Sequence, residues 1–104
     1  MTANNLTPFY ATHPGEVLKD EVEYRGISQK ALASDIGVPY KALNDILNER
    51  RSVSTETAML FEAALGISAQ TLLALQNDYD IAEAKKNKSF QHRLLSIRKI
   101  AAVF

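Results

Sequence analysis

Polar side chains that can hydrogen-bond to base edges recur at helical spacing between residues 40 and 48. Tyr40, Asn44 and Asn48 are four residues apart and would share one line of a helix, with Lys41 beside them. An asparagine amide can pair with adenine, a lysine can contact guanine or a phosphate, and a tyrosine can stack on a thymine methyl group. We therefore predict that Tyr40, Lys41 and Asn44 contact DNA bases.

Further side chains that suit the DNA backbone lie on both sides of this segment. Asn48, Arg50 and Arg51 would follow the helix, and Gln29 and Lys30 would begin the helix before it, where the N-terminus attracts phosphate. These five residues are the predicted phosphate contacts. Asp45 would repel phosphate unless it accepts a hydrogen bond from a cytosine amine or neutralises Lys41. The helical periodicity and the glycine turn alone favour DNA binding and an ordinary helical bundle about equally.

Short helices joined by tight turns must position these side chains. Three joints, Gly26-Ile27-Ser28, Gly37-Val38-Pro39 and Gly66-Ile67-Ser68, combine a glycine that ends a helix with a residue that starts the next one. The apolar spacing predicts helices over about residues 14–24, 29–36, 40–48, 55–65, 69–86 and 89–104. We expect an all-α fold.

The two helices around Gly37 have the layout of a helix-turn-helix. Ala33 is small where the second helix must cross closely, Gly37 supplies the positive φ of the turn, and Leu43 and Ile46 would bury the second helix against the first. The second helix of such a pair enters the major groove. The outer face of residues 40–48 would then be the surface that reads DNA.

Charge and periodicity divide the 104 residues into three parts. Residues 1–12 are polar and aperiodic and are predicted to be a flexible arm, residues 13–84 the DNA-binding domain, and residues 85–104 a basic amphipathic helical segment. The whole chain has 12 basic and 12 acidic residues, yet residues 85–99 contain six bases and no acid. One face of this segment carries an apolar stripe that we expect to form a dimer interface: Phe90, Leu94, Ile97 and Phe104. Two alternatives stay open, namely that the stripe covers the domain's own core or that it binds a protein partner.

Several other classes of protein find no support in the sequence. His13 and His92 have no partner at metal-ligand spacing, and no nucleophile–base pair is evident, so we expect no metal, no cofactor and no enzyme. There is no cysteine, no apolar run that could cross a membrane and no signal peptide. We expect a cytoplasmic protein.

The ordered motifs resemble the lambda-repressor-like (XRE) family. The resemblance rests on Ser28-Gln29-x-x-Leu32-Ala33-x-x-Ile36-Gly37-Val38-Pro39 and on Leu43-x-x-Ile46-Leu47-Asn48-x-x-Arg51. His13-Pro14-Gly15-Glu16-x-Leu18, Ser52-Val53-Ser54, Ala64-Leu65-Gly66-Ile67-Ser68 and the segment 75–80 look like the HigA (VapI-type) antitoxin subfamily. The match spans about residues 13–84.

This resemblance implies a five-helix domain, a homodimer, an operator palindrome in its own promoter, and a HigB-type ribonuclease toxin as partner. The apolar spacing adds a C-terminal helical extension after residue 86, where the chain departs from the family. It also implies phosphate contacts at Gln29 and Asn48 and base contacts at Tyr40, Lys41 and Asn44. Two alternatives stay open. One is a regulator of the same fold without a toxin, and the other is an interaction module that has lost DNA binding.

Overall fold

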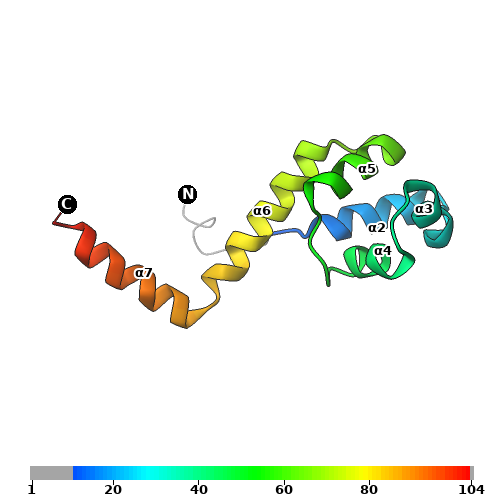
Figure 1. The fold of residues 1–104 in the computed structure, drawn as a ribbon. Coiled ribbons are helices and arrows are strands. Elements are labelled where there is room, and N and C mark those ends of the chain that lie inside the picture. Colours follow the sequence, from blue (N-terminus) through cyan, green and yellow to red (C-terminus); the bar gives the residue numbers. More distant parts are fainter. Residues whose placement is uncertain (1–10, 104) are drawn as a thin grey trace, which may run out of the picture.

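The computed structural model describes residues 11–103, which form six α-helices and no strand (Figure 1). The helices are α2 (Pro14–Tyr24), α3 (Gln29–Ile36), α4 (Tyr40–Leu47), α5 (Thr55–Leu65), α6 (Ala69–Lys85) and α7 (Lys88–Ala101). The all-α prediction is confirmed. Nearly all of the predicted N-terminal arm, and Phe104, lie outside the described residues.

Serine caps begin three of the helices, two of them at the predicted joints. The hydroxyls of Ser28, Ser54 and Ser68 each accept a hydrogen bond from the backbone N–H three residues further on. Such a cap stabilises a helix by about 1 kcal/mol relative to alanine. Gly26 and Gly66, with positive φ, precede Ser28 and Ser68, and Gly37, also with positive φ, precedes Pro39 at the start of α4. These joints fold α2–α5 and the first part of α6 into one body, from which α6 leads out to α7 (Figure 1).

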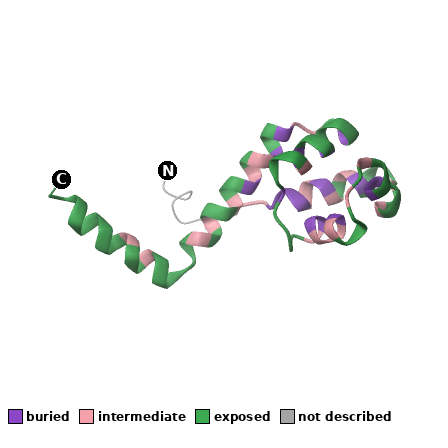
Figure 2. Cartoon of the chain, in the orientation of Figure 1, coloured by how far each residue is buried: buried purple, intermediate pink, exposed green. Residues whose placement is uncertain are grey.

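The core lies within this body, and α7 contributes nothing to it (Figure 2). Phe61 and Leu72 are fully buried where α5 packs on α6, and Leu18 is fully buried on α2. Helix α4 is anchored through one face, which buries Leu43, Ile46 and Leu47. Burial of a leucine or isoleucine side chain contributes about 1.5–3 kcal/mol. Helix α4 is therefore a fixed part of the core.

The start of α2 touches the backbone of α4 directly. A Cβ atom on Gly15 would lie 1.9 Å from the carbonyl oxygen of Ile46, so only glycine permits this approach. The buried His13 caps the same helix, since its Nδ1 accepts the Gly15 N–H at 2.9 Å. Its ring packs edge-on against Tyr79, with the ring centroids 4.8 Å apart. Gly15 thus permits the close packing of α2 on α4, and His13 joins the start of α2 to α6.

Helix α6 buries a polar residue that the apolar spacing did not predict. The spacing of Leu72, Leu75 and Tyr79 places these residues on one apolar stripe, but Gln76 is buried while Leu75 and Tyr79 are only half-buried. The Gln76 oxygen accepts the Val53 N–H at 2.8 Å, and its amide donates to Asp80 at 3.0 Å. Gln76 therefore fastens the segment between α4 and α5 to the body.

Candidate nucleic-acid interface

The turn between α3 and α4 has the predicted geometry. Gly37 has φ +74°, a conformation that strains any residue with a Cβ atom. The Val38 N–H donates to the Ala33 carbonyl at 3.0 Å, which closes α3, and α4 begins three residues after Gly37. The structure thus contains the helix-turn-helix expected over residues 28–48.

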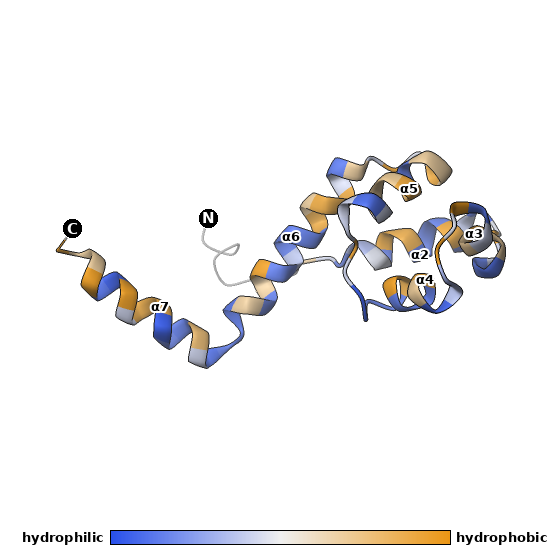
Figure 3. Ribbon diagram, viewed as in Figure 1, coloured by the Kyte–Doolittle hydropathy of each residue, from blue (hydrophilic) through white to orange (hydrophobic). Residues whose placement is uncertain are grey.

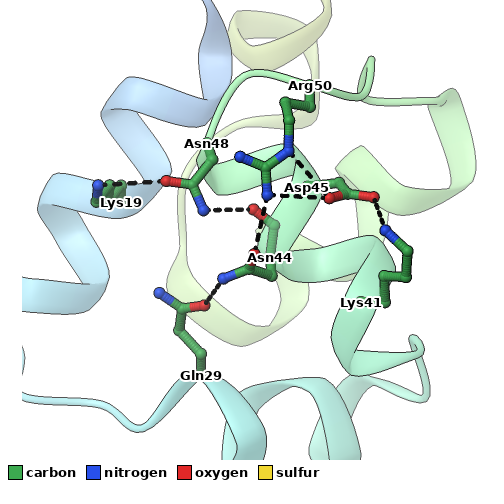
Figure 4. Close-up of polar contacts among 7 residues, drawn as sticks. All are labelled: Lys19, Gln29, Lys41, Asn44, Asp45, Asn48 and Arg50. Atoms are coloured by element: carbon green, nitrogen blue, oxygen red, sulfur yellow. Dashed lines mark hydrogen bonds and ion pairs between the residues drawn. The ribbon is translucent and has the colours of Figure 1, made fainter.

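The outward face of α4 divides into exposed and half-buried residues. Tyr40 and Lys41, in the first turn, are exposed, whereas Asn44, Asp45 and Asn48 are half-buried. The prediction that this face points away from the core is therefore confirmed for the first turn. The three half-buried residues belong to a polar network shown in Figure 4.

Asn44 lies at the centre of that network. Its Nδ2 donates to the Gln29 Oε1 at 3.1 Å, and its Oδ1 accepts from the Arg50 guanidinium at 3.2 Å (Figure 4). The Asn44 amide is therefore held from α3 on one side and from the segment after α4 on the other. Fixed orientation reduces the entropy that a side chain loses when it binds. These three residues are 15 and 6 positions apart in the sequence, which is why sequence reasoning did not pair them.

Asp45 lies between two cations. It accepts hydrogen bonds from Lys41 at 3.2 Å and from Arg50 at 3.2 Å. The bond from Lys41 lowers the pKa of the Asp45 carboxyl below its usual value, and Arg50 acts in the same direction. The Lys41 side chain stays 85% exposed while the Asp45 side chain is 13% exposed. Of the two roles considered for Asp45, its contacts fit neutralisation, and the trio keeps one net positive charge.

A left-handed residue ends α4 and directs the chain toward Arg50 and Arg51. Glu49 has φ +64°, its N–H donates to Ile46, and the Arg50 N–H donates to Asp45 at 2.7 Å. This pair of bonds is a Schellman motif, whose left-handed position usually holds glycine. Residue type does not predict this turn, because glutamate occupies the left-handed position.

The remaining predicted phosphate ligands surround the same face. The Lys30 ammonium lies 5.9 Å from the centre of the Tyr40 ring, a cation–π contact between α3 and α4. Asn48 donates to the Asn44 carbonyl at 2.9 Å and accepts from Lys19 at 3.5 Å. Arg51 is exposed, and no ion pair joins it to another residue within 11–103. All eight predicted contact residues thus lie on α3, on α4 or just after α4.

The arrangement combines hydrogen-bonding groups with a cationic border. This combination is typical of a surface that binds a DNA duplex, and less typical of a metal-binding or catalytic site. Among residues 11–103, no group of three or more metal-ligating side chains comes together. Nor does any helix in that range have the length and apolarity needed to cross a membrane.

The sequence and the fold both match known proteins. A helix-turn-helix family model matches residues 18–72. Virulence-associated protein I of Dichelobacter nodosus is 35% identical over 79 residues, which cover 75% of this chain and 73% of the relative.

Two solved antitoxins resemble the whole helical body. The Pseudomonas aeruginosa antitoxin HigA, determined with the higBA promoter, has a TM-score of 0.72 and 35% identity over 79% of this chain and 90% of its own. A HigA-family antidote protein from Coxiella burnetii has a TM-score of 0.69 and 33% identity over 75% of this chain and 86% of its own. The chain therefore belongs to the helix-turn-helix family, and its relatives there are antitoxins of the HigA type.

Proposed function

We propose that the protein is a sequence-specific transcriptional repressor and the antitoxin of a HigB-type ribonuclease, and that it regulates its own operon. The observation that carries this proposal is the outward face of α4, where Tyr40 and Lys41 are exposed and the Asn44 amide is held in place by Gln29 and Arg50. The similar Pseudomonas aeruginosa antitoxin, determined with the higBA promoter, supports it.

Helix α4 would enter the major groove with Tyr40, Lys41 and Asn44 against base edges. The amides and cations around it would bind the backbone on either side: Gln29, Lys30, Asn48, Arg50 and Arg51. The zero net charge of the chain does not oppose this assignment, because Asp45 is paired with Lys41 and Arg50. This pairing weakens the alternative of an interaction module that has lost DNA binding.

The active species would be a homodimer on a palindrome. Two copies of α4 would read half-sites about one helical turn, roughly 34 Å, apart. Residues 13–84 would form the reading domain, and residues 85–104 a separate dimerising segment with Phe90, Leu94, Ile97 and Phe104. The same role places the chain in the cytoplasm with its operator and its toxin, and assigns it no catalytic activity.

Operator binding can be tested by fluorescence anisotropy on DNA from upstream of the chain's own gene and on a scrambled duplex. We expect clear preference for the former and a steep loss of affinity between about 50 and 200 mM salt. Lys41→Ala and Asn44→Ala should each cost about 1–3 kcal/mol on the operator and little on the scrambled duplex. Arg51→Ala should weaken both alike. Equal wild-type affinity for the two duplexes would refute the repressor assignment.

The toxin assignment needs a separate test. The small reading frame beside the gene should arrest growth when expressed alone, and co-expression of this chain should restore growth and yield a complex of the two proteins. Normal growth without the antitoxin would instead support a regulator with no toxin partner.

A further inference from the structure

Helix α7 presents an apolar stripe that no residue within 11–103 of the same copy fully covers. It has no buried residue, its main contacts are with α6, and it points away from the body (Figures 1 and 2). Phe90 is 40% exposed and Ile97 is 51% exposed, with Leu94 half-buried between them. Figure 3 shows apolar and polar residues alternating along the helix. A lone helix of 14 residues is marginally stable in water, so α7 needs a partner surface.

The charge of residues 85–104 favours some partner surfaces for the α7 stripe over others. Residues 85–104 contain six basic residues and no acid, whereas residues 1–84 contain all 12 acidic residues and six basic ones, a net charge of −6. Two α7 helices side by side would bring like charges together. A ribonuclease, which must bind RNA, would also present cationic surface. The complementary partner is an acidic surface with an apolar centre.

The body of this chain has such a surface between α3 and α5. Ile27, Ile36, Leu60 and Ala63 are among the residues that line an open groove of about 570 Å³ there. Asp35 is the one charged residue in the lining. On the same face of α5, one turn before Leu60, lies the exposed acid Glu56.

The side chains of α7 match this groove in pattern. Phe90, Leu94 and Ile97 follow each other at spacings of four and three, on one face of the helix. At 100° per residue, Arg93 falls on one flank of the stripe and Arg98 on the other. An apolar ridge with a cation on each side fits an apolar groove that has Asp35 in its lining and Glu56 one turn beyond it, which is the pattern of helix-in-groove recognition.

We propose that α7 of one copy lies in the α3/α5 groove of a second copy, and that the second copy returns the same contact. A copy cannot fill its own groove, because α6, a rigid 17-residue helix, separates α7 from the α3/α5 end of the body (Figure 1). Such a reciprocal exchange is a closed two-fold dimer. The groove has no lining residue from α4, so the reading surface stays uncovered. The inference rests on the homodimer of the proposed function and specifies its interface.

The test measures the dimer dissociation constant of the full chain by sedimentation equilibrium without DNA. Leu94→Asp should raise this constant at least about tenfold, because a buried leucine is lost. His92→Asp introduces the same residue on the opposite face of α7 and should leave the dimer dissociation constant unchanged. In the groove, Ala63→Arg should raise it similarly, and the matched control Ala74→Arg, on an exposed position of α6, should not. An unaltered helical CD spectrum confirms that each variant is folded.

Mixing two defective variants gives the decisive result. The Leu94→Asp variant has an unaltered groove, and the Ala63→Arg variant has an unaltered α7. An equimolar mixture should therefore form heterodimers with one intact contact, and these should have a lower dissociation constant than the dimers of either variant alone. Pairing of α7 with α7 predicts no such recovery. Wild-type dimerisation by Ala63→Arg, or a mixture no tighter than its components, would overturn the proposal. Since no DNA is present, loss of operator specificity in the wild type would refute the proposed function without changing this result.

Discussion

The hydrogen bond between Gln29 and Asn44 leads to a prediction that can be measured at a single base pair. Gln29→Ala removes the acceptor that lies 3.1 Å from the Asn44 amide nitrogen but leaves Arg50 on the amide oxygen. Asn44 then keeps one of its two side-chain restraints. We expect the variant to fold normally and to discriminate less well at the base that Asn44 contacts.

The magnitude follows from the contacts. A hydrogen bond between neutral side chains contributes about 0.5–1.5 kcal/mol net, and a bidentate asparagine–adenine contact discriminates by about 1–3 kcal/mol. Loss of one restraint should therefore cost about 1 kcal/mol of preference, or roughly fivefold. Loss of the Gln29 phosphate contact should add a penalty that is the same for every sequence.

The assay is a competition titration in which each operator position is substituted in turn, with wild type, Gln29→Ala, Asn44→Ala and the double variant. Lys30→Ala is the matched control, because Lys30 contacts the Tyr40 ring and has no bond to Asn44. The effects of Gln29→Ala and Asn44→Ala on binding should be non-additive by about 1 kcal/mol at one base pair. Additive effects, or a Gln29→Ala penalty that is uniform over all positions, would refute the idea that Gln29 orients Asn44.

Three further predictions concern charge and stability. Asp45→Asn should strengthen binding to any duplex and steepen its salt dependence, measured by anisotropy, because Lys41 and Arg50 lose their shared carboxylate; an unchanged slope would contradict the neutralising role. Glu49→Gly should raise the free energy of unfolding in urea by about 0.5–1 kcal/mol, since glycine accepts positive φ without strain, whereas Glu49→Ala should not. Burial lowers the pKa of His13 despite the nearby carboxylates of Glu49 and Asp80. The contribution of the His13 cap to the free energy of unfolding should be complete above the unfolded-state pKa of about 6.5. It should be lost as pH falls through the lower pKa of the folded state. His13→Asn should flatten this pH dependence of the free energy of unfolding, and an unchanged slope would show that His13 is not its source.

The sequence predicted those parts of the structure that local patterns determine. The joints at Gly26, Gly37 and Gly66 carry their signal within three or four residues, and the starts of α3, α4 and α6 follow from them. Apolar spacing likewise predicted that Leu43 and Ile46 anchor α4.

What the sequence could not predict depends on residues far apart in the chain. Gln76 is buried because it satisfies the Val53 N–H, which lies 23 positions earlier. Asn44 is fixed by Gln29 for a similar reason, and Glu49 adopts a conformation that its residue type does not suggest. The sequence predicted the stripe on α7 and a dimer interface for it, but not the groove that we propose as its partner, because that groove is assembled from α3 and α5, which are far apart in the chain.

The contact between Gly15 and the Ile46 carbonyl sets how deeply the reading helix sits, and no side chain takes part in it. The outward residues of α4 can therefore change without altering the position of the helix in the domain. With the proposed base contacts, substitutions at positions 40, 41 and 44 alone would be enough to change the operator that is recognised. The backbone contact that positions α4 would stay the same.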